Sequence, residues 1–233
     1  MHARLGYDPV GDEYKVLCVV IFDGHERDTT AEIKQEHHVY SLGSHSGWRE
    51  AQITTEKSYT DVEGGICING AIYYGVGPTK IARFDLRYEK VTFIEAPKDY
   101  YTSWSLINHQ GKLGGMQYDN YLYELRVWIQ EKQKLWNKMS CVAPCEWRDL
   151  YKDKRPSSPG EIHTGEVMFV SDRLQSSRPF SVFYCDVIQE SFRSAQVKGI
   201  ADYEFRRTHG IGMHDLDMLC FPGYTENIMS LWP

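Results

Sequence analysis

One pattern of short apolar strands recurs along the 233 residues, and it constrains the fold more than any single motif. Each copy places apolar, β-branched or aromatic runs around turns and ends in a strand that begins with an aromatic residue. A period of about 40 to 50 residues with four strands in each repeat is typical of β-propeller blades. We therefore expect an all-β, propeller-like fold of about four four-stranded antiparallel blades, with each aromatic inside a strand. These aromatics are Trp48, Phe93, Trp136 and Phe192, separated by 45, 43 and 56 residues.

The clearest turn signal is the stretch GICINGAIYYGV. Asn69 and Gly70 separate two apolar runs there, and Asn-Gly supplies the positive φ angles of a tight hairpin turn at low cost. The sequence therefore predicts a hairpin with Asn69-Gly70 at its tip.

Helix signals are weak. Tyr123–Met139 has the composition of a helix, but LRVWIQ alternates with a period of two, so we interpret the segment as strands. Asp23–Glu36 and Pro144–Thr164 are expected to be long irregular loops. A C-terminal hairpin is expected near Leu219–Leu231. We also expect Tyr14–Phe22 to lack a neighbouring strand, because the first blades of the propeller are missing and the ring is open. The alternative is that the two C-terminal strands pair with Tyr14–Phe22 and close a small four-bladed ring.

Composition and charge argue against several classes of protein. The net charge of −6 and the pI near 5.8 leave no basic field for phosphate backbones, so nucleic acid is not an expected partner. The longest apolar run, VLCVVIF, is far shorter than the roughly 20 residues that span a bilayer, and no signal peptide is expected. Four cysteines in apolar segments favour a reducing compartment. We expect one intracellular domain over residues 1–233, in the cytoplasm, the nucleus or both.

Catalytic motifs are incomplete. The segment GSHSG resembles a nucleophile elbow, but its centre is His45 rather than serine. Gly210 and Gly212 provide two glycines of a dinucleotide fingerprint without the third glycine or its βαβ context. A small propeller hydrolase is the enzyme alternative, and no acid, base or metal cluster supports it. We expect no catalytic residues and no cofactor.

A metal site has little support. Cys141 and Cys145 form a C-x₃-C pair, but zinc needs two further ligands from a second knuckle, and His163 is the only His in that loop. Four other candidates lie close together in sequence, but neighbouring strand residues point to opposite faces. We expect no metal. These four are His209, His214, Asp215 and Asp217.

Several segments resemble the F-box-associated domain of plant F-box proteins, in its type 3 form. They occur in the expected order across nearly the whole chain. The segments are LGYDPVGDEYKVL, CINGAIYYG, FDLRYEKVTFI, LINHQGKLG, LRVWIQEKQKLWNKM and ENIMSL.

The resemblance implies a non-catalytic β-propeller module that binds a protein substrate for a cullin-RING, SCF-type ubiquitin ligase. In that family an F-box precedes the domain and docks the ligase adaptor. Here Met1 stands four residues before LGYDPV, and no F-box helix pattern follows. We therefore expect adaptor binding only if an F-box is supplied upstream. The alternative is a truncated gene product or fragment with no ligase role.

Binding surfaces of propellers lie on loops, where exposed aromatic and arginine side chains act as interface anchors. Packing beneath a loop is the competing role for Trp and Tyr. The candidate anchors are Tyr100, Tyr101, Trp104, Trp147, Arg148, Arg206 and Arg207.

Overall fold

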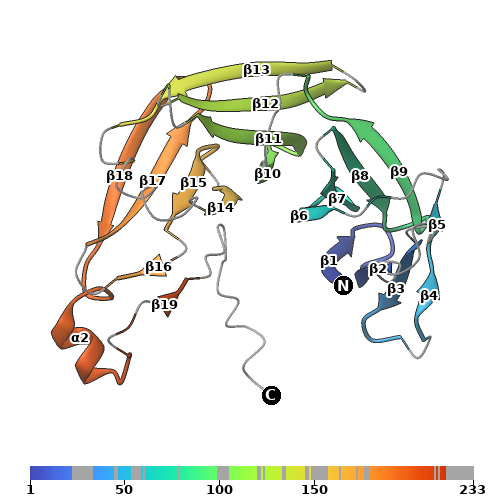
Figure 1. Ribbon diagram of the computed structural model, residues 1–233, viewed down its shortest axis with the longest axis horizontal. Helices are drawn as coiled ribbons and strands as arrows, with labels where there is room; N and C mark the ends of the chain where they lie inside the picture. Colours follow the sequence, from blue (N-terminus) through green and yellow to red (C-terminus); the bar gives the residue numbers. More distant parts are fainter. Residues whose placement is uncertain are drawn as a thin grey trace, which may run out of the picture. The chain divides into compact units, whose positions relative to one another are not determined.

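The computed structural model (Figure 1) consists almost entirely of antiparallel sheets. It describes residues 1–22, 34–44, 47–53, 59, 61–77, 79–98, 105–119, 122, 124–132, 135–144, 147, 157–162, 164–171, 173–175, 179–212, 214 and 216–218.

The first sheet has four strands in the order β1-β2-β3-β4. They are β1 (His2–Asp8), β2 (Glu13–Phe22), β3 (Lys34–Ser41) and β4 (Arg49–Glu50), all antiparallel. The sequence did not predict β1. Because β2 pairs with β1 on one side and β3 on the other, the expectation that Tyr14–Phe22 lacks a neighbouring strand is wrong.

The second sheet has five strands in the order β5-β9-β8-β7-β6. Its antiparallel strands are β6 (Val62–Ile68), β7 (Ala71–Val76), β8 (Lys80–Asp85) and β9 (Lys90–Glu95). The short strand β5 (Gln52–Ile53) adds to β9 in parallel.

The predicted hairpin joins β6 to β7. Ile68 pairs with Ala71, and Asn69 and Gly70 have φ angles of 48° and 76°, as a tight hairpin turn requires. The Asn69 side-chain amide also donates a hydrogen bond to the Gly111 carbonyl at 3.0 Å. The prediction of a hairpin at this dipeptide is confirmed.

The third sheet has the order β10-β11-β12-β13. Its strands are β10 (Ser105–His109), β11 (Lys112–Asp119), β12 (Glu124–Lys132) and β13 (Leu135–Val142). The interpretation of Tyr123–Met139 as strands rather than a helix is confirmed.

The fourth sheet has the order β14-β15-β17-β18. Its strands are β14 (Ser157–Glu161), β15 (Val167–Val170), β17 (Phe180–Asp186) and β18 (Ser191–Val197). Because β14 lies within Pro144–Thr164, the expectation of a wholly irregular loop there is wrong.

Two short strands pair near the end of the described chain: β16 (Arg173–Leu174) and β19 (Leu216–Asp217). In the sequence, the helix α2 (Tyr203–Thr208) lies between these strands, where Arg206 and Arg207 were expected to lie on a loop. The hairpin expected near Leu219–Leu231 lies outside the described residues.

The prediction that the four aromatic residues of the repeat lie inside strands is partly wrong. Phe93, Trp136 and Phe192 lie in β9, β13 and β18 as expected. Trp48 instead precedes β4, is 56% exposed and packs on Tyr40 with ring centroids 5.5 Å apart. The Trp48 ring therefore packs on a neighbouring side chain at the surface of the sheet, and its backbone is not part of a strand.

The chain divides into two compact units. Unit 1 comprises residues 1–115 and 128–137, and unit 2 comprises 116–127 and 138–233, so the strands of the third sheet contribute to both. Each unit has its own buried apolar clusters. The all-β, propeller-like class built from four-stranded antiparallel sheets is confirmed, while the single domain stays a prediction. Among the described residues, no helix is long and apolar enough to cross a membrane.

Candidate functional site

The register of the first sheet assigns its side chains to two faces. Residues directly opposite each other on antiparallel strands point to the same side of a sheet. Leu17 pairs with Val39, and both are fully buried, which defines a core face. Tyr7 pairs with Tyr14 on the opposite side, which defines an outer face.

The core face packs against the second sheet within unit 1. Leu17, Val19 and Val39 are 0% exposed and form one cluster with Ile72 and Phe84 from β7 and β8. Apolar packing therefore covers the centre of this side of the sheet.

The outer face carries large apolar side chains that remain exposed. Tyr14 and Trp48 are 52% and 56% exposed. The Tyr7 and Tyr14 rings pack with centroids 4.9 Å apart. Exposed aromatics gathered on a rigid sheet mark interaction surfaces more strongly than scattered ones. We call this set the outer aromatic face: Leu5, Tyr7, Tyr14, Val16, Tyr40 and Trp48.

Carboxylates accompany the outer aromatic face. His38 pairs with Glu50 across the ladder, and its imidazole lies 3.1 Å from the Glu36 carboxylate. Asp12 accepts a hydrogen bond of 2.6 Å from the Tyr7 hydroxyl. Among the side chains that the structure describes in this sheet, the arginines and the lysine lie on the core face. They are Arg4, Lys15 and Arg49.

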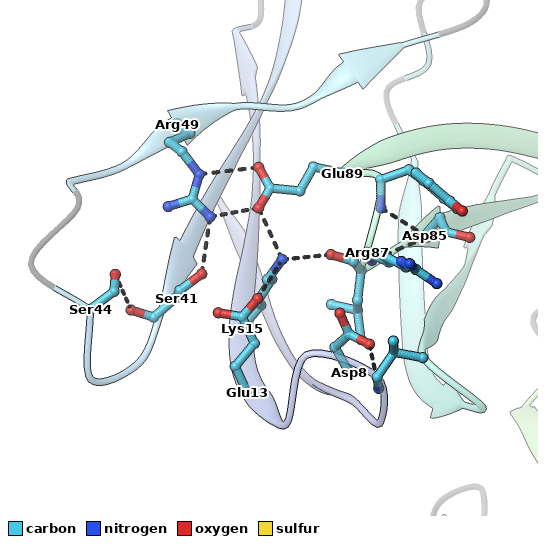
Figure 2. A network of polar contacts seen from close by, with 12 residues as sticks. Asp8, Glu13, Lys15, Ser41, Ser44, Arg49, Asp85, Arg87 and Glu89 are labelled. Atoms are coloured by element: carbon cyan, nitrogen blue, oxygen red, sulfur yellow. Dashed lines mark hydrogen bonds and ion pairs between the residues drawn. The ribbon is translucent and has the colours of Figure 1, made fainter.

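A partly buried ionic network around the buried Lys15 supports this sheet from the core side (Figure 2). The Lys15 ammonium donates to the Leu86 carbonyl at 2.8 Å and to Glu89 at 3.1 Å, and it lies 2.9 Å from Glu13. Arg49 holds Glu89 through two hydrogen bonds, of 2.6 and 3.1 Å. Two strands of the first sheet are thereby joined to the turn between β8 and β9.

The electrostatics of the network keep its groups charged. The Arg49 guanidinium and then the Lys15 ammonium hold the pKa of Glu89 below its ordinary value, against the effect of burial. Burial lowers the pKa of Lys15, but hydrogen bonds to Glu13 and Glu89 outweigh it, so that pKa is raised. Charged, hydrogen-bonded side chains therefore connect the first sheet to the turn between β8 and β9.

A second polar cluster is enclosed between the first two sheets. The His37 imidazole Nε2 lies 2.6 Å from the Tyr59 hydroxyl and 3.1 Å from the Tyr74 hydroxyl, and the Arg4 guanidinium stacks on Tyr74. Burial, with charge from His38 and Arg4, lowers the pKa of His37 to about 4, and burial raises the pKa of Tyr59 to about 12. Both groups are neutral near pH 7, which suits packing rather than proton transfer.

An open hollow of about 510 Å³ lies on the second sheet, lined by Arg83, Asp85, Lys90 and neighbours. Arg83 already bonds Asp85 at 3.1 Å and the Tyr73 hydroxyl at 3.3 Å. Arg83 and Asp85 therefore satisfy each other within the hollow. Within the part of the chain that the structure describes, no group of three or more His, Cys, Asp or Glu side chains can hold a metal.

Two candidate anchors are buried. Trp147 is 0% exposed and packs edge-on against Phe169, Phe183 and Phe192, with centroids 4.6 to 5.5 Å apart. Arg206 is also 0% exposed and donates to the carbonyls of Gly212 and His214. Their expected exposure is wrong, because the aromatic cluster and the carbonyls occupy the side chains.

The structure describes one of the other candidate anchors. Arg207 is exposed on α2, so binding there stays a prediction. The rest lie outside the described residues: Tyr100, Tyr101, Trp104 and Arg148.

The outer aromatic face was not predicted from the sequence. One signal was available: VLCVVIF is apolar at every position, which indicates a strand with apolar groups on both faces. The pairing of Tyr7 with Tyr14 was not accessible because β1 was not predicted.

The sequence resembles known proteins along nearly its whole length. The F-box associated beta propeller domain matches residues 1–223. The F-box protein At1g30790 of Arabidopsis thaliana is 32% identical over 97% of this chain and 61% of its own length. The putative F-box protein At1g46984 of the same plant is 31% identical over 97% of this chain and 54% of its own length. The Arabidopsis thaliana F-box protein DOR is 29% identical over 87% of this chain and 52% of its own length. The chain thus spans about half to three-fifths of these relatives.

Among solved structures, the N-terminal domain of Nup159 is similar at a TM-score of 0.40 and 11% identity, covering 83% of this chain and 60% of its own.

Proposed function

Because the chain belongs to the F-box associated domain family, we propose that it is a non-catalytic module that recognises a protein substrate for an SCF-type ubiquitin ligase. The outer aromatic face is its docking surface. The ligase adaptor binds only where an F-box is joined to the module, and the module works in the cytoplasm or nucleus, where such ligases act.

One observation carries the proposal: large aromatic side chains lie exposed on a sheet whose other face packs against the second sheet. Tyr14 and Trp48 each expose more than half of their surface, although both belong to ring pairs that restrict them. Aromatic anchors that are already ordered lose little entropy when a partner covers them.

The chemistry of the face defines the partner. Apolar rings flanked by Glu36, Glu50 and Asp12 fit a protein segment that combines apolar side chains with lysine or arginine. A further β-sheet of a longer polypeptide is the competing occupant, because an apolar sheet face is also what a neighbouring sheet would cover.

The test compares the double variant Tyr14→Ser, Trp48→Ser with a matched control, Tyr88→Ser, Tyr203→Ser. The control tyrosines are 68% and 60% exposed but lie outside the face. Proximity labelling in plant cells identifies proteins labelled by the wild type and the control but not by the face variant. Each such protein is then purified and its Kd measured.

We expect the face variant to weaken binding by at least about 30-fold, as loss of a hot spot does, and the control to bind like the wild type. Equal binding by all three proteins would refute the docking surface. Loss of labelling together with loss of the β-sheet circular dichroism spectrum would instead show that the face is needed for folding, as an interface with another sheet is.

A further inference from the structure

Two buried thiols from different sheets meet in unit 2. The Sγ atoms of Cys141 on β13 and Cys185 on β17 lie 3.3 Å apart, although the residues are 44 positions apart in sequence. Cys141 is 5% exposed and Cys185 is 0% exposed. Since a disulfide bond is about 2.05 Å long, the two sulfur atoms need to approach by only about 1.3 Å.

The two thiols differ in accessibility. Cys141 is the second-last residue of β13, the outermost strand of its sheet, and the next residue, Val142, is 76% exposed. Cys185 lies on β17, which has β15 and β18 on either side, and it pairs with Val167 and Phe192. Cys141 thus lies at the end of an edge strand beside an exposed residue, whereas Cys185 lies inside its sheet.

Their hydrogen bond also gives them different chemistry. The contact with Cys185 lowers the pKa of the Cys141 thiol, with burial acting in the opposite direction. The same contact and burial both raise the pKa of Cys185. Because the thiolate is the reactive form, Cys141 is the thiol that an oxidant attacks first.

We propose that Cys141 and Cys185 are a redox modification site, at which a peroxide converts the two thiols into a disulfide that joins the third sheet to the fourth. The Cys141 thiolate attacks the peroxide and breaks its O–O bond, which gives a sulfenic acid and, for hydrogen peroxide, hydroxide. Cys185 sulfur then attacks the Cys141 sulfur, the S–O bond breaks and water leaves with the Cys185 proton. In total, two thiols and one hydrogen peroxide give one disulfide and two waters.

The disulfide has a mechanical consequence for unit 2. It closes a loop of about 45 residues and ties the end of β13 to β17, so the unfolded chain loses freedom. In a reducing compartment such a bond forms only while an oxidant is present and is reversed by thiol exchange.

The experiment treats the purified 233-residue protein with equimolar hydrogen peroxide, blocks the remaining thiols with an alkylating agent and maps the peptides by mass spectrometry. We expect a Cys141–Cys185 linked peptide that disappears after dithiothreitol. We also expect the melting temperature to rise by about 5 to 15 °C on oxidation. Cys141→Ser and Cys185→Ser abolish both the linked peptide and the rise.

Cys145→Ser is the matched control, because Cys145 is four residues from Cys141 and would replace it if the assignment were wrong. We expect this variant to form the link and to gain the same thermal stability. The proposal is overturned if wild-type Cys141 and Cys185 are both alkylated after peroxide treatment, or if Cys185 links to Cys145. Mapping the wild type decides the question even if a serine variant fails to fold.

Discussion

At the scale of single residues, Gly6 and His37 show how burial overrides the apparent character of a side chain. A Cβ atom on Gly6 would lie 2.8 Å from Ile72 and Leu86, so glycine is what lets β1 approach the second sheet. The apolar residues of β1, Leu5 and Tyr7, therefore lie on the exposed side. A hydrophobic pattern read from sequence alone cannot predict this inversion, which is why β1 and the outer aromatic face were missed.

His37 gives a pH-dependent prediction. Its folded pKa of about 4 lies below the ordinary 6.5, so the folded state favours the neutral imidazole. Stability is complete above pH 6.5 and falls as the pH decreases toward 4, because the unfolded chain binds the proton first. The loss attributable to His37 is about 3 kcal/mol, since one pKa unit corresponds to about 1.4 kcal/mol.

The measurement is urea unfolding of the wild type and His37→Gln between pH 7 and pH 4.5. Glutamine keeps a hydrogen-bonding group near the tyrosines but does not titrate. We expect the variant to be less stable at pH 7 and the difference in unfolding free energy to shrink as the pH falls. A difference that stays constant across this range contradicts the assignment.

Trp136 tests packing at a position predicted from the repeat. Its ring is partly buried against a cluster containing Ile68, Ile81 and Leu113, and its Nε1 donates to the Glu95 carbonyl at 3.1 Å. The cost of Trp136→Ala is therefore about 2 kcal/mol, below the roughly 3 to 5 kcal/mol of a fully buried tryptophan. Trp136→Phe keeps most of the packing and costs about 1 kcal/mol. Equal stability of Trp136→Ala and wild type by chemical denaturation would place the ring outside the packing.

At the scale of elements, the strands that carry an apolar run were predictable and those held by backbone pairing were not. β7 and β8 combine β-branched and aromatic residues and end at clear turns. β14 has the sequence SSPGE, which carries no strand signal, and it exists through pairing with β15. α2 has six residues, too few for a helical period to be recognised. For both elements, prediction from the sequence would have required knowledge of the tertiary contacts.

The ionic network between elements gives a further prediction. Glu89→Gln removes the carboxylate that Arg49 and the buried Lys15 share, and it should lower the free energy of unfolding at pH 7 by about 2 kcal/mol. The matched control Glu131→Gln breaks an exposed pair with Lys112 and should cost less than about 1 kcal/mol.

The pH dependence has a defined sign. Because the folded pKa of Glu89 is lowered, its contribution is present above the unfolded value of 4.5 and is lost as the pH falls through the folded pKa. The two variants should therefore converge in stability at low pH. Equal losses from both at pH 7 would mean that the network does not stabilise the first sheet.

For the molecule as a whole, the family and the class of fold could be predicted from the sequence. The outer aromatic face, which we propose as the docking surface, could not. The resemblance rests on strand and turn motifs such as CINGAIYYG, which specify packing. Specificity depends on which side chains stay exposed after packing, and that became visible only with the register of the first sheet. The candidate anchors Trp147 and Arg206 were misplaced for the same reason.

If the outer aromatic face is the docking surface, a protein partner covers it. Hydroxyl-radical footprinting, with oxidation read by mass spectrometry, measures this directly in the free protein and in its complex with a partner identified by labelling. We predict that oxidation of Tyr7, Tyr14 and Trp48 falls several-fold in the complex, while exposed Tyr88 and Tyr203 are unchanged. Protection of Tyr203 and the surrounding α2 with undiminished oxidation of Tyr14 and Trp48 would show that the partner binds elsewhere.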